Sequence, residues 1–374
     1  MKKIALALVL VVVMVNLSGG VFAWTNEVNT KLNFDWWEDS NDNKGYQFYI
    51  PVKFTLMESN FTFDILSGYC YTVYNPANDP TESMGDILDT KINLSYELID
   101  RWPVDVLLGL DFNLPTGRTK LSLKELSLIM DPDLVSIISF GEGFNINPTI
   151  NIAKDLGNLT VGVGFGYLLR SEYDYASTIK DYDPGDIYNL TMEIQYQFSP
   201  SLNWYLFGQY TYYEMDKVQD EPYYQEGKLF LAGTGLSLLE QTWEFHANLQ
   251  AVFRGRSRYN FGPLGIKKED HSGYGNEWVG TLGAKYYLPS NRYIGSTLEI
   301  LYIDENDYPK NSPFYLGARE KVALTLTAGQ RWKNLVGELS IRGILMHDDE
   351  NWFSPENGIS YRGFSIALKL TSYF

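Results

Sequence analysis

Apolar and polar residues alternate along most of this chain, and the closing stretch, residues 360–374, shows the pattern most clearly. One parity there carries Phe364, Ile366 and Leu368, whereas the other carries small or polar residues such as Lys369. A two-residue period places the two sets on opposite faces of an extended strand. The stretch is therefore predicted to be a β-strand with one apolar face and one polar face.

The same alternation recurs in a series of segments from residue 28 to the end of the chain. In most of them one parity is rich in Leu, Ile, Val and aromatic residues, while the other carries Lys, Asp, Asn, Thr or Gly. We interpret each segment as a strand. The segments are 28–36, 46–56, 61–74, 90–98, 102–114, 145–152, 159–170, 187–198, 202–213, 228–238, 242–254, 277–288, 292–303, 320–332, 335–346 and 360–374.

Short and long connections alternate between these segments. Turns such as 58–60, 199–201 and 333–334 follow every second segment, and longer linkers follow the others. This arrangement is typical of outer-membrane barrels, which keep the short turns in the periplasm and the long loops outside. The long linkers are 75–89, 115–144, 171–186, 214–227, 255–276, 304–319 and 347–359, and only the first connection of that series, 39–44, is brief.

These features predict an all-β fold, a transmembrane antiparallel up-and-down β-barrel. A structure that spans lipid must pair its backbone N–H and C=O groups internally, which only helices and closed barrels achieve. We expect about 16 strands, within a range of about 12–16, and periplasmic termini. The prediction requires that the first and last segments pair with each other. Pro51 and Pro148 fit poorly within strands of a closed barrel, and we expect β-bulges there.

Aromatic residues on the apolar parity support this assignment. They concentrate beside the short turns and beside the long loops, as expected for the two lipid–water boundaries. The alternative, an aromatic-rich core of a soluble β-sandwich, predicts no such sorting by loop length. Those beside short turns are Trp102, Phe198, Trp204, Trp243, Trp332 and Phe374, and those beside long loops are Trp36, Tyr46, Phe112, Tyr188, Phe253, Trp278 and Tyr302.

Residues 1–23 are predicted to be a secretory signal peptide. Lys2 and Lys3 precede an apolar core at 4–15, and a small-x-small cleavage site follows at 21–23. The alternative is a transmembrane anchor, but the apolar run is shorter than the roughly 20 residues that a spanning helix needs. We therefore expect a signal peptide followed by a barrel domain in the outer membrane of a Gram-negative bacterium.

The composition limits the partners of this barrel domain, residues 24–374. The chain carries 30 Lys and Arg against 46 Asp and Glu, a formal net charge of −16, which argues against nucleic acid as a partner. We expect contact with outer-membrane lipid and with a small-molecule solute. We also expect the barrel-assembly machinery to engage the strand that ends at Phe374. The single cysteine, Cys70, cannot form an internal disulfide and is interpreted as a small wall residue.

The polar parity of the strands is expected to line a central lumen. A barrel of about sixteen strands encloses water unless something fills it, and the charged residues of this parity need water or partners. The residues that we expect to line the lumen are Lys31, Asp35, Lys53, Lys91, Glu97, Asp105, Asp111, Glu193, Glu244, His246, Arg254, Lys285 and Arg342.

Excess negative charge falls in the long loops, for example at Asp181, Asp183 and Asp186. Clustered carboxylates can hold divalent cations, whereas the simpler interpretation is a solvated acidic surface. We predict no metal site and no cofactor.

The longest connection, 115–144, is the candidate for a constriction. Ser122 and Glu125 form a capping-box pattern that predicts a helix start, and Asp131 before a proline predicts its end. We expect the helix to present an apolar face, and a loop with this much apolar surface is expected to fold into the lumen and narrow it. The alternative is a lid on the outer rim. The candidate constriction residues are Ser122, Leu123, Glu125, Leu126, Met130 and Asp131, and Ile129 would lie on the same face.

Residues 90–198 resemble outer-membrane proteins assigned to the MetA pathway of phenol degradation, a transporter-like family. The turn-like motifs that carry the resemblance are LGLD at 108–111, LPTG at 114–117, GEG at 141–143 with Asn147-Pro148, and YDPGD at 182–186. The resemblance implies passage of small, aromatic or hydrophobic compounds and supplies no binding residues.

The function that we predict is passive diffusion of a small solute through the lumen. One alternative is a surface scaffold or receptor whose lumen is plugged. Another is an outer-membrane hydrolase that uses His246, but no nucleophile motif or metal-ligand spacing accompanies this histidine. We therefore predict that the protein is not an enzyme.

Overall fold

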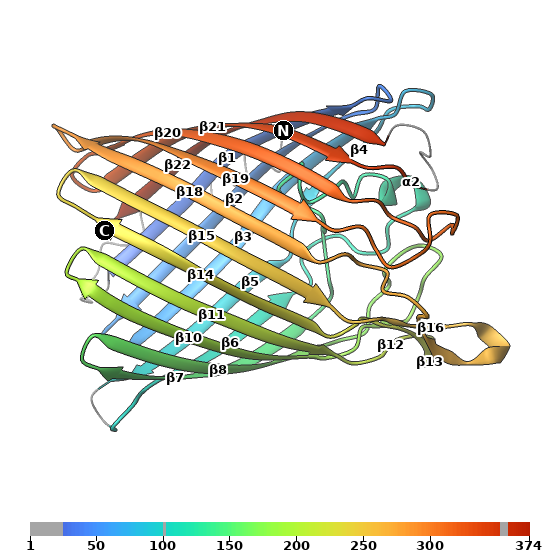
Figure 1. Ribbon diagram of the computed structural model, residues 1–374, viewed down its shortest axis with the longest axis horizontal. Helices are drawn as coiled ribbons and strands as arrows, with labels where there is room; N and C mark the ends of the chain where they lie inside the picture. The colour runs from blue at the N-terminus through green and yellow to red at the C-terminus, as the bar shows by residue number, and fades with distance from the viewer. Residues whose placement is uncertain (1–24, 100–101, 352–357) are drawn as a thin grey trace.

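Sixteen long antiparallel strands close into a barrel in the computed structural model, which describes residues 25–99, 102–351 and 358–374 (Figure 1). The predicted signal peptide at 1–23 lies outside the described residues. The long strands are β1 (Thr25–Asp39), β2 (Lys44–Glu58), β3 (Phe61–Asn75), β5 (Thr90–Leu98), β6 (Asp105–Leu114), β7 (Asn145–Leu156), β8 (Leu159–Arg170), β10 (Ile187–Ser199), β11 (Leu202–Tyr213), β14 (Leu229–Leu239), β15 (Trp243–Arg254), β18 (Glu277–Leu288), β19 (Arg292–Ile303), β20 (Arg319–Arg331), β21 (Leu335–Asp348) and β22 (Ile359–Tyr373).

The first and last strands pair with each other and close the barrel. β1 and β22 run antiparallel, with Glu27 opposite Tyr373 and Asp39 opposite Tyr361. The Phe374 backbone N–H donates to the carbonyl of Asn26 at 2.9 Å. The C-terminus lies at the end of the barrel that carries the short turns (Figure 1). The predicted fold class is confirmed, since closure leaves no free sheet edge in the barrel wall.

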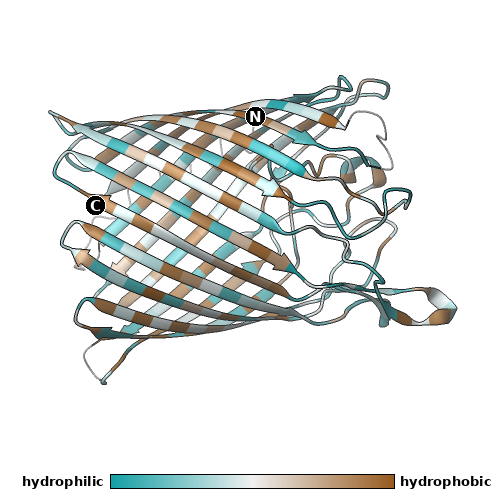
Figure 2. Ribbon diagram, in the orientation of Figure 1, coloured by the Kyte–Doolittle hydropathy of each residue, from teal (hydrophilic) through white to brown (hydrophobic). Residues whose placement is uncertain are grey.

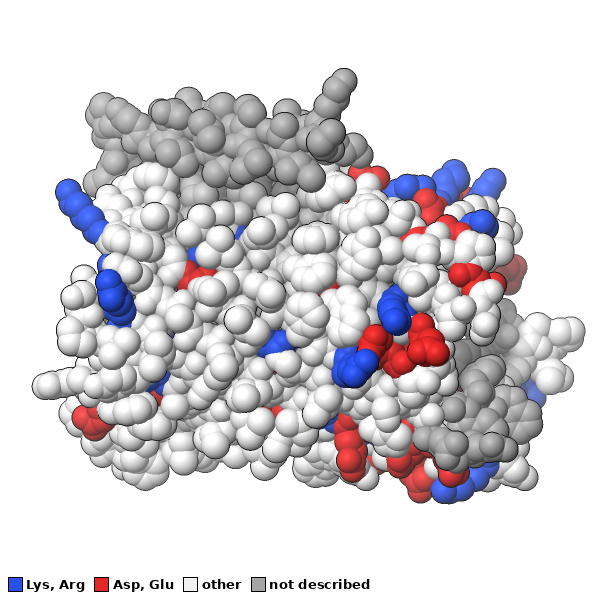
Figure 3. Space-filling view, turned by 90° about the horizontal axis from the view of Figure 1, so that it is seen from above, with Lys and Arg blue, Asp and Glu red and all other residues white. Residues whose placement is uncertain are grey.

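Alternation along each strand separates two environments (Figure 2). Apolar side chains on one parity face outward and stay exposed, as at Leu282 (59%), Leu326 (55%) and Leu345 (67%). On the side seen in Figure 3, most charged residues gather at the end with the long loops, and the wall between the two ends is largely uncharged. Exposed apolar side chains on a closed wall indicate contact with lipid.

The aromatic residues at the ends of the strands also face outward. Trp102, Trp243 and Trp332 are 59%, 41% and 49% exposed near the short turns, and Trp278 is 40% exposed near the long loops. This distribution fits two aromatic girdles at the boundaries of the bilayer.

The connection 75–89 contains a strand that the pattern did not predict. β4 (Glu82–Ile87) pairs with the upper half of β3, and β5 pairs with its lower half. Together they form one interrupted neighbour of β3, and Leu88 bridges the gap through its N–H to the carbonyl of Gly68 at 2.8 Å.

The two prolines interrupt the ladder without a bulge, so the expected bulges are wrong. Pro51 stays opposite Gly68, and Pro148 stays opposite Leu110, each in an unshifted register. On the other side of each proline the pairing lapses for two residues and resumes in the same register. A proline removes one donor, and losing one rung costs the barrel less than shifting every side chain to the other face.

Three of the long loops build a second, five-stranded sheet beyond the barrel rim (Figure 1). The loop after β6 instead contains the short helix α2 (Leu123–Leu126). Within the described ranges, no helix is both long and apolar enough to cross a membrane. The second sheet consists of β9 (Tyr182–Asp183), β12 (Asp216–Val218), β13 (Glu221–Gln225), β16 (Arg258–Asn260) and β17 (Ile266–Lys268), with a 3-10 turn η1 (Gly262–Leu264) in the last hairpin.

Candidate functional site

The connection between β6 and β7, residues 115–144 (the β6–β7 loop), contacts strands on both sides of the seam between β1 and β22. Gln47 of β2 is fully buried and bonds the backbone of Ile137 twice, with its Nε2 donating at 2.9 Å and its Oε1 accepting at 2.8 Å. Ser136 donates its N–H to Asp35 of β1 at 3.1 Å and accepts from Asn33 at 2.9 Å. These wall residues belong to the polar parity, so the loop lies against the inner face of the barrel.

Buried apolar side chains lie mainly between this loop and the wall. Trp37 of β1 donates its indole N–H to the sulfur of Met130 at 3.3 Å, and its ring lies 6.1 Å from that of Tyr74. Such contacts form two clusters of buried side chains, which together act as a small core inside the barrel. The first contains Trp37, Met130, Leu134, Val135, Ala323, Ile344 and Met346, and the second contains Cys70, Met84, Leu88, Leu121, Leu128 and Phe140.

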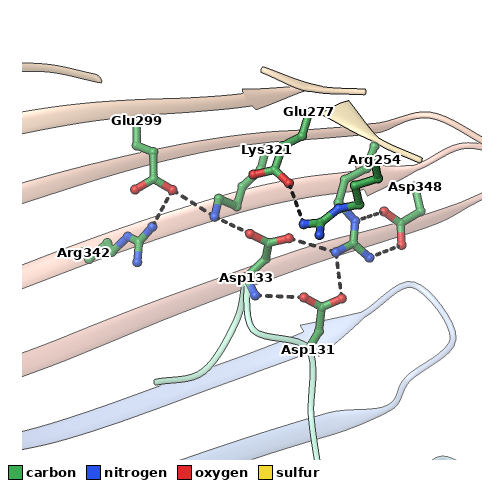
Figure 4. Close-up of polar contacts among 9 residues, drawn as sticks. Asp131, Asp133, Arg254, Glu277, Glu299, Lys321, Arg342 and Asp348 are labelled. Atoms are coloured by element: carbon green, nitrogen blue, oxygen red, sulfur yellow. Dashed lines mark hydrogen bonds and ion pairs between the residues drawn. The ribbon is translucent and has the colours of Figure 1, made fainter. Parts of the chain in front are cut away.

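Two aspartates of the loop meet two cations of β20 (Figure 4). Arg319 lies 2.8 Å from both Asp131 and Asp133, and Lys321 lies 2.6 Å from Asp133. Lys321 is only 6% exposed, so its ion pair with Asp133 is largely withdrawn from water. Removing one partner of such a pair is costly because the other charge stays buried.

The network continues along the wall away from the loop (Figure 4). Glu299 of β19 accepts from Lys321 and from Arg342 of β21, at 2.9 Å in each case. Arg319 also holds the carboxylate of Asp348 through its Nε at 2.6 Å and its Nη2 at 2.8 Å. The loop thus completes a charge network to which five wall residues on β19, β20 and β21 contribute.

The pKa of Asp133 reflects these contacts. Burial of the carboxyl group would raise its pKa, but the hydrogen bonds and positive charges of Lys321 and Arg319 outweigh burial and hold the pKa below the ordinary value. Asp133 is therefore ionised at neutral pH and supplies the negative charge that the two wall cations need.

Asp89 joins both ends of the β6–β7 loop. Its carboxylate accepts from the N–H groups of Gly117 at 2.8 Å and Glu142 at 2.7 Å, and from the Asn113 amide at 2.7 Å. Gly117 packs so closely on the carbonyl of Phe140 that a Cβ would lie 1.9 Å from that oxygen. The entry and exit of the loop are consequently side by side.

The predicted capping box is present, but the predicted helix is too long. Ser122 accepts from the Glu125 N–H, and the Glu125 carboxylate accepts from the Ser122 N–H at 2.9 Å. Glu125 also pairs with Arg118. The helix ends after a single turn, where the hydroxyl of Ser127 bonds the carbonyl of Lys124 at 2.7 Å.

The apolar face expected from a longer helix does not form. Leu123 is 69% exposed, whereas Leu128, which the helical spacing did not select, is 1% exposed. Met130 is buried, and Leu126 and Ile129 are partly buried against the second cluster. Only a continuous α-helix keeps positions three and four apart on one side. Here the α-helix ends at Leu126, and the N–H groups of Leu128 and Ile129 instead bond carbonyls three residues earlier.

Five of the predicted lumen-lining residues, Lys53, Glu244, Arg254, Lys285 and Arg342, form ion pairs within the described part of the chain. The ring of His246 lies over Gly283 of β18. Within the described residues, no group of three or more His, Cys, Asp or Glu side chains is arranged to hold a metal ion. The ion pairs are Lys53–Asp64 at 3.2 Å, Lys285–Glu244 at 3.8 Å, Arg342–Glu299 at 2.9 Å, and Arg254 with Glu226 and with Glu277 at 3.7 Å each.

The remaining predicted residues occupy other parts of the polar parity. Asp111 accepts from Asn147 at 2.9 Å, and Lys31 stands directly opposite Lys369 on β22. Lys91 lines a cavity of about 380 Å³ beside the base of the β6–β7 loop. Glu97, Asp105 and Glu193 line a larger cavity on the wall between β5 and β15.

The sequence analysis selected Asp35, Met130 and Asp131 but missed the other residues that hold the loop. Trp37 stands on the polar parity among charged neighbours, and that mismatch is a usable signal for an inner contact. Asp89 and Asp133 lie in connections, where alternation carries no information. Arg319 and Asp133 meet although 186 positions separate them.

Comparison with known proteins identifies no family. No family model matches the sequence, and no curated protein matches it. OccAB1 of Acinetobacter baumannii matches with a TM-score of 0.50 at 9% identity, over 96% of this chain and 98% of that one. An anion-selective porin from Comamonas acidovorans has a TM-score of 0.43 at 12% identity, over 94% and 99%. At such identities the likeness shows the fold alone, and the MetA-pathway resemblance stays a prediction.

The closed wall and its outward apolar face decide the location. Strands can cross lipid only when every backbone group is paired within a closed barrel. The protein lies in the bacterial outer membrane. In outer-membrane barrels the short turns face the periplasm, and the second sheet accordingly lies on the extracellular side.

Proposed function

We propose that the protein is a channel through which small solutes diffuse passively, with a lumen narrowed by the β6–β7 loop. The observation that carries the proposal is the attachment of this loop to inward side chains of β1, β2 and β20, including the ion pairs of Asp133. A loop held on one side of the lumen reduces its cross-section and leaves the opposite wall accessible.

The solutes that we propose are small, with aromatic or hydrophobic members. The resemblance of residues 90–198 to the MetA-pathway proteins motivates this class. Apolar inward side chains of the wall opposite the loop, such as Leu107, Phe207 and Leu231, support it.

Single-channel recording in planar bilayers tests the proposal. The wild-type barrel should conduct, and deletion of 120–138 should raise its conductance because the inward mass of the loop is removed. The remaining ends can be joined, since Gly117 and Phe140 are adjacent. Deletion of 260–266 in the β16–β17 hairpin, which lies in the outer sheet, is the control and should leave conductance unchanged.

Three other results would redirect the assignment. A folded barrel that stays silent would contradict the channel and favour the scaffold or receptor. Unchanged conductance after deletion of 120–138 would show that the loop is not the constriction. Hydrolysis of lipid or peptide substrates that disappears in His246→Ala would support the hydrolase instead. Recognition of the last strand by the barrel-assembly machinery stays a prediction.

A further inference from the structure

A cavity of about 830 Å³ lies against the wall between β5 and β15. The β6–β7 loop contacts β1, β2, β20 and β21, which lie on the other side of the barrel. The middle of the cavity is formed by Ala153 and Gly162, which stand opposite each other on β7 and β8. Because these residues project little or no side chain into the lumen, the wall forms a recess there. Its volume falls in the range typical of small-molecule sites.

The recess is electrostatically one-sided. Three carboxylate residues line it, Glu97, Asp105 and Glu193, and none of the described lining residues is Lys or Arg. Glu97 and Glu193 are exposed to the lumen. Low-dielectric walls with one sign of charge concentrate ligands of the opposite sign.

The same recess carries apolar and aromatic surface. Leu107 stands opposite Glu97, and Phe207 stands opposite Glu193, so two of the three carboxylate residues have an apolar neighbour on the next strand. The ring of Phe207 lies over Gly233, stacked 6.1 Å from the ring of Tyr205. A Cβ at Gly233 would lie 2.3 Å from the Phe207 ring, so the glycine allows the ring to lie along the wall.

This juxtaposition selects a ligand by chemistry. An aromatic ring and a carboxylate that line the same recess both attract an ammonium group, the ring through its quadrupole and the carboxylate through its opposite charge. The apolar side chains favour a ligand with a hydrophobic body. A hydrated inorganic cation would gain from the carboxylates alone, and an anion would be repelled.

We propose that this recess is a binding site for small organic cations that combine a primary ammonium group with an aromatic or aliphatic body. The site deepens the proposed channel function, on which it rests, by naming a preferred class of solute. Glu193 and Phe207 are the central recognition pair, and Glu97, Leu107 and Leu231 complete the surface.

Binding to the detergent-solubilised barrel tests the site without requiring conduction. Calorimetric titration should detect benzylammonium and should detect neither benzoate nor benzyl alcohol at the same concentrations. Glu193→Gln and Phe207→Leu should each weaken benzylammonium binding about threefold to fivefold, the range of one exposed ion pair or cation–π contact. Glu338→Gln, which removes an inward carboxylate outside the recess, should change it less than about twofold.

Channel recording separates the two proposals. Benzylammonium should reduce the wild-type current, and Glu193→Gln should relieve that block. A barrel that binds benzylammonium but never conducts would overturn the channel and leave the site. A conducting barrel would overturn the site if it bound benzyl alcohol as well as benzylammonium, failed to bind benzylammonium, or lost no affinity in Glu193→Gln.

Discussion

A single carboxylate, that of Asp133, connects the β6–β7 loop to two cations of the barrel wall. Arg319 and Lys321 lie on the same strand and parity, and Asp133 reaches both at less than 3 Å. Because Lys321 is almost completely withdrawn from solvent, its charge depends on partners that the protein supplies. At the scale of one residue, the position of the loop therefore depends on the ion pairs of Asp133 with Arg319 and Lys321.

We expect Asp133→Asn to loosen the β6–β7 loop. The substitution keeps the volume but removes one of the charges that offset Lys321 and Arg319, a loss of at most about 3 kcal/mol because Glu299, Asp131 and Asp348 remain. Single-channel recordings should show a larger or more variable current than the wild type.

Asp183→Asn is the matched control for this substitution. Asp183 pairs with Lys217 at 3.2 Å in the outer sheet, where both side chains are more exposed. An exposed pair contributes about 1 kcal/mol or less, so the current should stay unchanged. Equal currents in the wild type and Asp133→Asn would refute the proposed role of Asp133.

The pKa of Asp133 predicts how the loop responds to pH. A carboxyl group whose pKa is lowered by folding stabilises the folded state above its unfolded pKa, about 3.9. That contribution is lost as pH falls through the lower folded pKa. Current fluctuations of the wild type should therefore stay constant from pH 7 to about 5 and increase only below about pH 4.

Asp133→Asn again supplies the comparison. The variant lacks the titrating group, so its fluctuations should already be high at neutral pH and change less on acidification. A wild-type response centred near neutral pH would point to another group.

At the scale of an element, the β6–β7 loop is held at its base as well as along its length. Asp89 stands where β4 ends and β5 begins, and the gap between them lets its carboxylate reach the loop. In an unbroken strand, Asp89 would be an ordinary residue of the barrel wall. The interruption in the wall therefore provides the anchor of the loop.

We expect Asp89→Ala to destabilise the barrel. The change leaves the N–H groups of Gly117 and Glu142 without their acceptor and removes one of the two acceptors of the Asn113 amide. Buried donors without partners cost about 1–3 kcal/mol each, and water can satisfy part of them, so we expect a loss on the order of 3 kcal/mol. Urea unfolding in lipid vesicles, followed by tryptophan fluorescence, measures the loss.

Asp79→Ala provides the control, because Asp79 is exposed in the same connection. Its stability should stay within about 0.5 kcal/mol of the wild type. If both variants were equally stable, Asp89 would not be an anchor.

At the scale of the whole molecule, the barrel separates lipid from lumen by parity alone. Leu282 of β18 is 59% exposed on the outer face, and Thr281 beside it stands opposite Glu299 on the inner face. Two adjacent residues thus face different environments, lipid for Leu282 and the lumen for Thr281. The same substitution at the two positions should give different kinds of effect.

Leu282→Arg should destabilise the barrel by about 2–4 kcal/mol, the cost of a cation on the lipid face near mid-membrane. Thr281→Arg places the same cation in the lumen beside Glu299, so stability should change little and ion selectivity should shift toward anions. Unfolding in vesicles and reversal potentials in a salt gradient measure the two outcomes. Equal destabilisation by both variants would contradict the assignment of the two faces.

The sequence by itself determined the barrel and its orientation. Alternation in each strand, the alternating lengths of the connections and the sorting of aromatic residues are local properties, because a strand period and a turn length are read within a few residues. The capping box at Ser122 was equally local. The strand register at Pro51 and Pro148 was not a local property, since it depends on the hydrogen bonds that the neighbouring strands make.

Only the tertiary structure decided where the β6–β7 loop lies and what holds it. Asp133 and Arg319 are far apart along the chain, and closure of the wall brings their side chains together. The exposure of Leu123 and the burial of Leu128 also follow from the path of the loop rather than from helical spacing. Contacts across a closed lumen depend on curvature and closure, and alternation within one strand contains information about neither.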